Sequence, residues 1–246
     1  DLVRMMAGAR GGHRFDPVGL VELKGLEDPV AACRVGWEPL SGREVSGADL
    51  PVRWHRGPAS LFVGRSAERR VLDDALKGAE AGDGRRVVLI GGEPGMGKTT
   101  LVSEFATEAH EGGAVVVYGR CDEDLSIPYQ PWREAMGHLV AAGLVEAAAL
   151  GALVGGATAG SGGVSDPEAE RYRLFRAVTD ALVSVAANHP VVVVLDDLHW
   201  ADAPTVVLLR HLATHAVDAR LVIVATYREA EITSGHPLSA VLAQLR

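Results

Sequence analysis

The sequence predicts an α/β fold in which helices cover both faces of a mostly parallel sheet, with a short β segment at the N-terminus. Apolar runs rich in Val, Ile and Leu recur between segments of helical character, and each run is nearly continuous. Strands read as continuous apolar runs when both faces of their sheet are buried, which is typical of parallel sheets. One run also leads through a glycine-rich turn directly into an amphipathic helix, as strand-to-helix connections in such sheets do.

Predicted strands and helices alternate from Leu61 to the end of the chain. The predicted strands cover residues 85–90, 114–119, 190–197 and 219–228. The predicted helices cover residues 67–80, 98–110, 131–140, about 144–153 and 167–188, one from Pro204, and one at the C-terminus. Ser66 is expected to cap the first of these helices, because serine favours that position. Residues 155–166 are rich in Gly and Ser and predict a surface loop.

The first part of the chain has a different pattern. Two short β-type runs, 18–25 and 30–37, flank a turn over Gly25–Pro29. Residues 41–58 are rich in Gly, Pro and charge without a clear period. We therefore divide the chain into residues 1–40, a linker over 41–58, and a main domain over 59–246.

Composition excludes several classes of protein. With 48% hydrophobic and 23% charged residues, the chain can bury a core. Its net charge of -8 disfavours direct contact with nucleic acid. Its two cysteines, Cys33 and Cys121, form no CxxC pair, which indicates a reducing, cytoplasmic setting. The apolar stretch 139–160 is dominated by Ala and Gly, so it predicts buried helices and no membrane span.

The glycine-rich turn has the spacing G-x-x-x-x-G-K-[ST]. Its residues are Gly92, Glu93, Pro94, Gly95, Met96, Gly97, Lys98 and Thr99. The backbone N–H groups of such a turn and the following helix N-terminus cradle phosphates. Lys98 would bind the β- and γ-phosphates and the Thr99 hydroxyl would ligate Mg²⁺, while Thr100 packs or caps beside them. The predicted fold class is therefore that of a P-loop NTPase.

A second acidic feature ends the strand over 190–197. In a parallel sheet, ligands gather at the carboxyl ends of the strands, so Asp196 and Asp197 should lie near the phosphate loop. Asp196 is the candidate that holds Mg²⁺ through water, and Asp197 the candidate that polarises the attacking water. The alternative is a solvated strand end or a helix-capping pair.

Two other segments belong with this site. Thr226 and Arg228 end the last strand, where Arg228 could sense the γ-phosphate; the alternative is an ion pair with Glu229 or Glu231. The run Phe62-Val63-Gly64-Arg65 precedes the first helix and could close over the base. Its alternative is a hydrophobic staple.

Three histidines allow weaker interpretations. His211 and His215 share a helix face, but no third ligand is evident, so packed or solvated histidines are favoured over a metal site. His199 follows the acidic pair and could reach a phosphate or only cap the turn. Its neighbour Trp200 is a core or interface residue.

The segment over residues 61–246 resembles the ATPase domain of the STAND class of signal-transduction NTPases, within the AAA+-like P-loop ATPases. The resemblance rests on "FVGR", "GGEPGMGKTTL", "GRCDEDLSIPYQPWREA", "VVVVLDDLHWAD" and "LVIVATYRE". It implies the central ATPase of a bacterial LuxR-type or AfsR-type regulator, with ATP, ADP and Mg²⁺ as ligands. Such domains rest with ADP and activate on exchange for ATP and assembly into homo-oligomers.

Residues 15–35 resemble the C-terminal end of a class III adenylate/guanylate cyclase domain. That resemblance implies a longer parent chain, in which other domains are the partners of this ATPase. The cyclase's own metal-binding residues would lie upstream, so no cyclase activity is expected here. Two departures from the ATPase pattern matter: Asp197 stands where typical members have Glu, and the lid domain is missing. Both imply slow turnover.

Three functions remain open at this stage. The first is a slow Mg²⁺-dependent ATPase acting as a regulatory switch, in which Lys98, Asp197 and Arg228 are catalytic. The second is a nucleotide-binding module without hydrolysis that gates an adjacent cyclase or DNA-binding domain. The third is an interaction scaffold, which the retention of Lys98, Thr99 and Asp196 opposes.

Overall fold

The computed structural model describes only part of the chain. The described residues are 14–21, 30–36, 50, 54, 64–124, 127–153, 166–215 and 218–245. They belong to two compact units, Asp1–Arg43 and Glu44–Arg246.

The first unit contains an antiparallel hairpin of β1 (Arg14–Val21) and β2 (Val30–Gly36). The predicted second strand is confirmed, but β1 begins four residues earlier than the run predicted from Val18. The register shifts between Pro17 and Gly19. Proline cannot donate a ladder hydrogen bond, so it is tolerated in a strand at such an irregularity.

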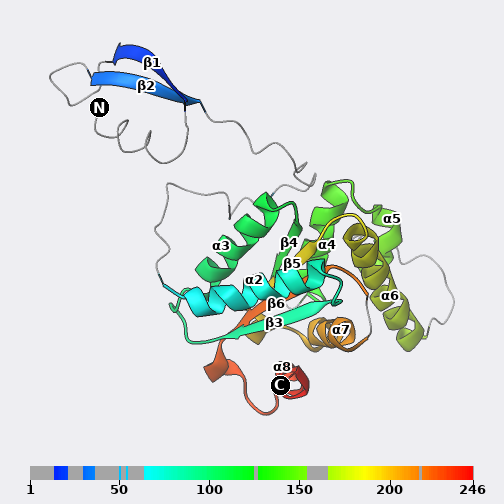
Figure 1. Ribbon diagram of the computed structural model, residues 1–246. Coiled ribbons are helices and arrows are strands. Elements are labelled where there is room, and N and C mark those ends of the chain that lie inside the picture. The colour runs from blue at the N-terminus through cyan, green and yellow to red at the C-terminus, as the bar shows by residue number, and fades with distance from the viewer. Residues whose placement is uncertain are drawn as a thin grey trace. The chain divides into compact units, whose positions relative to one another are not determined.

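The second unit is built on a parallel sheet of four strands in the order β3-β6-β5-β4 (Figure 1). The strands are β3 (Arg86–Gly91), β4 (Val115–Arg120), β5 (Val191–Asp196) and β6 (Leu221–Tyr227). The α/β fold predicted from the continuous apolar runs is confirmed, as is every predicted strand of this sheet.

Helices cover both faces of the sheet (Figure 1). One face packs against α2 (Ser66–Glu80) and α3 (Lys98–Glu111). The other packs against α4 (Gln130–Ala141), α5 (Ala147–Leu150), α6 (Pro167–Ala186), α7 (Ala203–Thr214) and α8 (Pro237–Leu245). Short 3₁₀ turns also occur in the part of this unit that the structure describes, among them η2 (Gly151–Leu153), η3 (Leu198–Trp200) and η4 (Glu229–Glu231).

The consecutive valines of β5 explain why helices pack on both faces of the sheet. Side chains alternate between the faces of a strand, so consecutive valines serve opposite cores. Val191 and Val193 lie in the core under α4, α6 and α7, whereas Val192 and Val194 lie in the core under α2 and α3. All of them are fully buried.

Two predicted boundaries are wrong. Ser66 is the first residue of α2 and not its cap: the N-cap is Arg65, which has a left-handed backbone and no side-chain capping bond. The helix predicted over about 144–153 is shorter, since α5 ends at Leu150 and η2 follows. Gly151, with φ of 49°, ends α5 as its C-cap and is the first residue of η2. The predicted loop over 155–166 lies outside the described residues except Asp166, which caps α6.

The predicted linker 41–58 needs a correction at one residue. Trp54 is 6% exposed and belongs to the core under α2 and α3. Its ring stands edge-on to Tyr118, with centroids 4.8 Å apart. Aromatic pairs in this arrangement add to the hydrophobic gain of burial. The packing of the second unit therefore begins before residue 59, and Leu50 also packs on this core.

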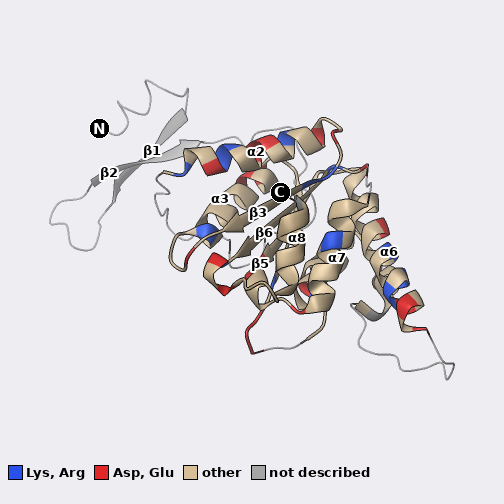
Figure 2. Ribbon diagram, turned by 90° about the horizontal axis from the view of Figure 1, so that it is seen from below, with Lys and Arg blue, Asp and Glu red and all other residues tan. Residues whose placement is uncertain are grey.

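Charges on the outer helices are mixed. Figure 2 shows basic and acidic residues interspersed along α2 and α6. Within the described residues, no helix is both long and apolar enough to cross a membrane.

The free edge of β4 is closed by α4. Tyr118 donates its backbone N–H to His138 Nδ1 at 3.4 Å, and Arg120 donates its own to Glu134 Oε2 at 2.9 Å. His138 and Glu134 are four residues apart, so they lie on one face of α4. An unpaired strand edge invites pairing with other chains, and α4 removes that risk here.

This edge makes the stability of the protein sensitive to acid. Burial lowers the pKa of His138, although Glu134 opposes that shift. The unfolded chain, with a histidine pKa of about 6.5, therefore takes up the proton first as the pH falls. Stability should fall as the pH drops through about 6.5, because a protonated Nδ1 cannot accept from Tyr118. We expect His138→Gln to melt with a weaker pH dependence between about pH 7 and 5.

The control variant is His189→Gln, which removes a histidine beyond the C-terminal end of α6. Its melting temperature should follow the wild-type pH dependence. Equal slopes for wild type and His138→Gln would contradict the role assigned to the β4 edge.

Candidate nucleotide-binding site

The glycine-rich loop joins β3 to α3, as the sequence predicts. Gly95 and Gly97 have φ of 77° and 76°, a left-handed conformation that side chains disfavour. Gly97 is the N-cap of α3, so the helix begins at Lys98. Gly91 ends β3 at a close approach: a Cβ there would lie 2.5 Å from Glu229 Oε1 and 2.7 Å from Tyr227 Oη. The loop is thus fixed at the carboxyl edge of the sheet.

Lys98 is buried against its own loop. It is 8% exposed, and its Nζ donates to the carbonyl oxygens of Gly92 at 2.8 Å and Glu93 at 3.0 Å. Thr99 and Thr100 remain exposed, and Met96 is 52% exposed. The amine is therefore held inside the loop while the loop and the first turn of α3 face solvent.

The segment before α2 reaches this loop. Arg65 donates from its guanidinium to the carbonyl oxygen of Met96. Gly64, with φ of 96°, precedes it. Val63 and Phe62 lie outside the described residues, so the proposed closure over the base stays a prediction for them.

Asp196 ends β5 in a buried polar cluster. It is 4% exposed, and its Oδ1 accepts from Thr226 Oγ1 at 2.5 Å while its Oδ2 accepts from Tyr118 Oη at 3.1 Å. The two donors come from β6 and β4, the neighbours of β5 on either side. Buried carboxylates need such partners, because desolvation without them is costly. The interpretation as a solvated strand end does not hold for Asp196.

The sequence alone did not reveal the order of the strands. β6 lies between the loop strand β3 and the acidic strand β5. Thr226 is therefore the residue that links the two acidic positions: its hydroxyl donates to Asp196 and accepts the backbone N–H of Asp197 at 3.0 Å. Tyr118 was not anticipated, because a tyrosine in an apolar run gives no sign of a partner far along the chain.

Asp197 is held by an arginine that was also not anticipated. Its backbone is left-handed, with φ of 60°, which is uncommon for a residue with a side chain. Its Oδ2 accepts from Arg120 Nε at 2.9 Å. Arg120 ends β4, so two strand ends together position this carboxylate.

Two arginines lie near the ring of Trp200. The guanidinium carbon of Arg228 is 5.0 Å from the centre of the Trp200 ring, and that of Arg120 is 5.8 Å away. Arg228 also pairs with Glu231 at 2.6 Å, which holds the pKa of Glu231 below its usual range. The ion pair left open by the sequence is thus present, and a role in sensing phosphate would require Arg228 to leave it.

His199 of η3 lies near the carboxylates of Asp197 and Glu231. Its side chain is fully buried, and neither ring nitrogen has a hydrogen-bond partner within the described residues. Its Nε2 is 3.7 Å from Glu231 Oε2 and 4.0 Å from Asp197 Oδ1. Burial lowers the pKa of His199 although both carboxylates oppose that shift. It neither caps the turn through its ring nor faces the solvent.

The histidines at the C-terminal end of α7 pack against neighbouring rings. The rings of His211 and His215 stack with centroids 4.0 Å apart, and His211 also packs on Phe175. Within the described residues, no group of three or more His, Cys, Asp or Glu side chains could hold a metal ion. Cys121 is buried, and burial raises the pKa of its thiol, so it is an unreactive core residue.

Comparison with known families decides what kind of domain this is. The family model of the AAA ATPase domain matches residues 61–224. The chain belongs to this AAA ATPase family. Membership implies that the domain binds nucleotide, and the match includes the loop, Asp196, Asp197 and all but the last three residues of β6.

Several solved structures are similar to this AAA ATPase domain. Cdc6p from Pyrobaculum aerophilum is 15% identical, with 70% of this chain and 42% of that chain covered and a TM-score of 0.46. The FIGL-1 AAA domain in complex with ADP is 16% identical, with 79% and 53% covered and a TM-score of 0.36. Drosophila ORC bound to AT-rich DNA and Cdc6 is 13% identical, with 73% and 59% covered and a TM-score of 0.37.

This AAA ATPase domain therefore spans about half the length of the structures it matches. No curated protein sequence matches it.

The oxygen atoms of the AAA ATPase site suit Mg²⁺. Magnesium is usually bound by one or two carboxylates or hydroxyls together with substrate phosphates, and rarely by an all-protein cage. The exposed Thr99 hydroxyl and the Asp196 carboxylate are hard oxygen ligands of this kind.

Proposed function

We propose that this AAA ATPase domain binds ATP with Mg²⁺, hydrolyses it slowly, and acts as a regulatory switch. One observation carries the proposal: the charged groups that would act on nucleotide are each bonded to the protein itself. Lys98 is bonded to two loop carbonyls, Asp197 to Arg120, and Arg228 to Glu231. Phosphate oxygens would take the place of the carbonyls at Lys98 and of Glu231 at Arg228, while Asp197 would keep Arg120, so binding and release of nucleotide would change the partners of Lys98 and Arg228.

Each residue has a role in this proposal. The loop N–H groups and Lys98 bind the phosphates, and Arg65 holds the loop carbonyl of Met96. Thr99 and Asp196 hold Mg²⁺, which neutralises charge on the phosphate oxygens. Asp197 orients the attacking water as a general base. Arg228 leaves Glu231 and binds the γ-phosphate, so its position depends on whether the γ-phosphate is present.

Slow turnover follows from the environment of Asp197. An aspartate is shorter than the glutamate of typical members, and Arg120 holds its carboxylate in an ion pair. The bond to Arg120 also fixes where this carboxylate points, and a base that is not placed directly beside the attacking water acts slowly.

We further propose the setting of this domain. It is the central ATPase of a cytoplasmic, STAND-class regulator of the LuxR or AfsR type. The hairpin of β1 and β2 is the end of a cyclase-like domain over residues 1–40. Partners are the other domains of the parent chain and further copies that assemble with nucleotide. The similarity of residues 15–35 and the run "LDDLHWAD" to those families supports this setting.

Thin-layer analysis of radiolabelled ATP incubated with this chain and Mg²⁺ tests the proposal. Labelled ADP should accumulate slowly, and filter binding should retain ATP. If the chain neither retains nor cleaves ATP, the proposal fails and the scaffold interpretation takes its place.

The second candidate function is a nucleotide holder without hydrolysis, favoured by the ion pair of Asp197 with Arg120. Asp197→Asn separates the two functions. If Asp197 is the base, we expect about 100-fold slower ADP formation with ATP retention on filters unchanged, because general bases contribute about 10²–10⁴-fold.

The matched control is Asp180→Asn, which removes an exposed carboxylate of α6 paired with Arg176 at 3.9 Å. It should hydrolyse ATP at the wild-type rate. ATP hydrolysis that is equally fast in Asp197→Asn would exclude Asp197 as the base.

A further inference from the structure

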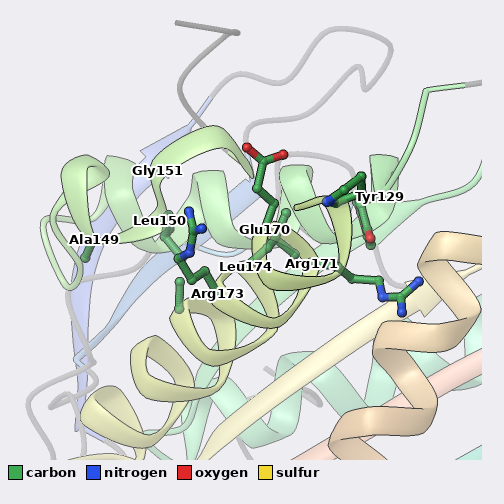
Figure 3. A pocket seen from close by; sticks show the side chains of 10 residues that line it. Tyr129, Ala149, Leu150, Gly151, Glu170, Arg171, Arg173 and Leu174 are labelled. Carbon is green, nitrogen blue, oxygen red and sulfur yellow. The ribbon is translucent and has the colours of Figure 1, made fainter. Parts of the chain in front are cut away.

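A pocket lies away from the phosphate loop, between α5, η2 and the first half of α6 (Figure 3). Its volume is about 560 Å³. Small-molecule sites commonly measure roughly 300–1,000 Å³ and are mostly apolar with a few polar groups. The lining residues are Tyr129, Ala149, Leu150, Gly151, Pro167, Glu170, Arg171, Arg173, Leu174 and Ala177.

The walls and the rim of this pocket differ in chemistry. Leu150 belongs to the core on that side of the sheet, and Leu174 packs on the same core. Figure 3 shows Tyr129 and Arg171 on one side of the pocket and Arg173 on the other. The pocket thus offers an apolar body with cationic groups on two sides.

The two arginines keep their charge available. Among the residues that the structure describes, Arg171 pairs with Glu168, at 3.9 Å between exposed groups, and such pairs are weak. Arg173 has no ion-pair partner within the described residues, and Glu170 is the one carboxylate of the lining. Figure 3 shows Arg171 on the same side of the pocket as Tyr129. Burial raises the pKa of the Tyr129 hydroxyl, Arg171 opposes this shift and Asp202 adds to it.

We propose that this pocket binds a small organic anion with an apolar body, such as an aryl carboxylate or sulfonate. The apolar body lies against Leu150, Leu174 and Ala177, the anionic group is bound by Arg171 and the Tyr129 hydroxyl on one side, and Arg173 on the other side adds to the positive potential of the pocket. Hydrogen bonds to charged groups are the strong ones, and the neighbouring apolar wall excludes water from them.

The pocket is connected to the candidate catalytic carboxylate. Tyr129 is the N-cap of α4 and has a left-handed backbone, with φ of 60°. One turn later, Glu134 of α4 accepts the backbone N–H of Arg120, whose side chain holds Asp197. A ligand that shifts Tyr129 therefore acts on Asp197 through α4 and Arg120. This part of the inference rests on the proposed ATPase.

The binding experiment uses two probes of the same shape. The anion 8-anilinonaphthalene-1-sulfonate and its uncharged relative N-phenyl-1-naphthylamine both fluoresce in apolar sites. Titrated into the whole chain, each should bind at one site. Arg171→Gln with Arg173→Gln should weaken binding of the sulfonate about tenfold or more, because hydrogen bonds to charged groups are stronger than neutral ones, and should leave binding of the neutral probe unchanged.

Two further variants locate the site. Ala149→Phe places a ring in the pocket from an exposed position of α5 and should abolish binding of both probes. Arg176→Gln removes an arginine of α6 that does not line the pocket and should bind both probes as wild type does. Cooperative melting of each variant shows that it is folded.

Several outcomes would overturn the proposal. Displacement of the sulfonate by ADP would place the probe at the phosphate loop. Unchanged binding in Ala149→Phe would place it elsewhere. Binding only after deletion of residues 154–165 would mean that this segment fills the pocket itself.

The sulfonate should also change the rate of ADP formation. Loss of that change in Ala149→Phe would show that the effect comes from the pocket. A chain that binds the probe without any ATPase activity would contradict the proposed function and leave the pocket standing.

Discussion

Replacing Lys98 with Ala should abolish measurable ATP hydrolysis by this domain. Lys98 is the one lysine of the loop, and its buried amine already lies inside the turn, bonded to the carbonyls of Gly92 and Glu93. On nucleotide binding the amine would turn from these neutral acceptors to phosphate oxygens, where charge grows in the transition state. Removing one such preorganised donor costs about 10²–10³-fold in rate, so ADP formation should fall by at least that factor.

The folding stability without nucleotide should change little in Lys98→Ala. Gly92 is half-buried and Glu93 is exposed, so water can replace the amine at both carbonyls. Lys77→Ala provides the control, since Lys77 is an exposed residue of α2 and the charge change is the same. ATP hydrolysis at the wild-type rate in Lys98→Ala, or its loss in Lys77→Ala, would mean that the loop does not act on phosphate.

Local patterns were sufficient to predict the elements of the sheet. Each strand is a continuous apolar run because both of its faces are buried, and no long-range information is needed to recognise it. The loop was equally predictable, because its glycines and Lys98 are adjacent in the chain. The acidic end of β5 was also predictable, because Asp196 and Asp197 are adjacent in the sequence.

The partners of these residues could not be predicted from the same patterns. Tyr118 and Arg120 lie 78 and 77 positions from the carboxylates that they hold. Their pairing depends on the order of the strands, which places β4 beside β5 and β6 between β5 and β3. Trp54 was predicted to lie in a linker for the same reason. Its local sequence is polar, and only the folded sheet brings Tyr118 to it.

The junction of β4 and α4 should be the position least tolerant of added volume. A Cβ on Gly119 would lie 1.8 Å from the carbonyl oxygen of Pro131 and 2.5 Å from its carbonyl carbon, both backbone atoms. No side-chain rotation can relieve this contact, so Gly119→Ala must displace the start of α4. We expect a loss of about 1–3 kcal/mol in the free energy of unfolding, measured by denaturant titration.

The same helix supplies the control. Gly137 lies in α4 and a Cβ there meets nothing within 4 Å, so Gly137→Ala adds a methyl group without a clash. Because glycine is a poor helix former, this variant should be about 0.5–1 kcal/mol more stable than wild type. Opposite signs for these two Gly→Ala changes would show that the close approach at Gly119, and not the loss of a glycine as such, determines the effect.

Since Glu134 and Arg120 are joined across this junction, Gly119→Ala should also disturb Asp197 and slow ADP formation. A stable Gly119→Ala variant with wild-type turnover would contradict the packing of α4 on β4.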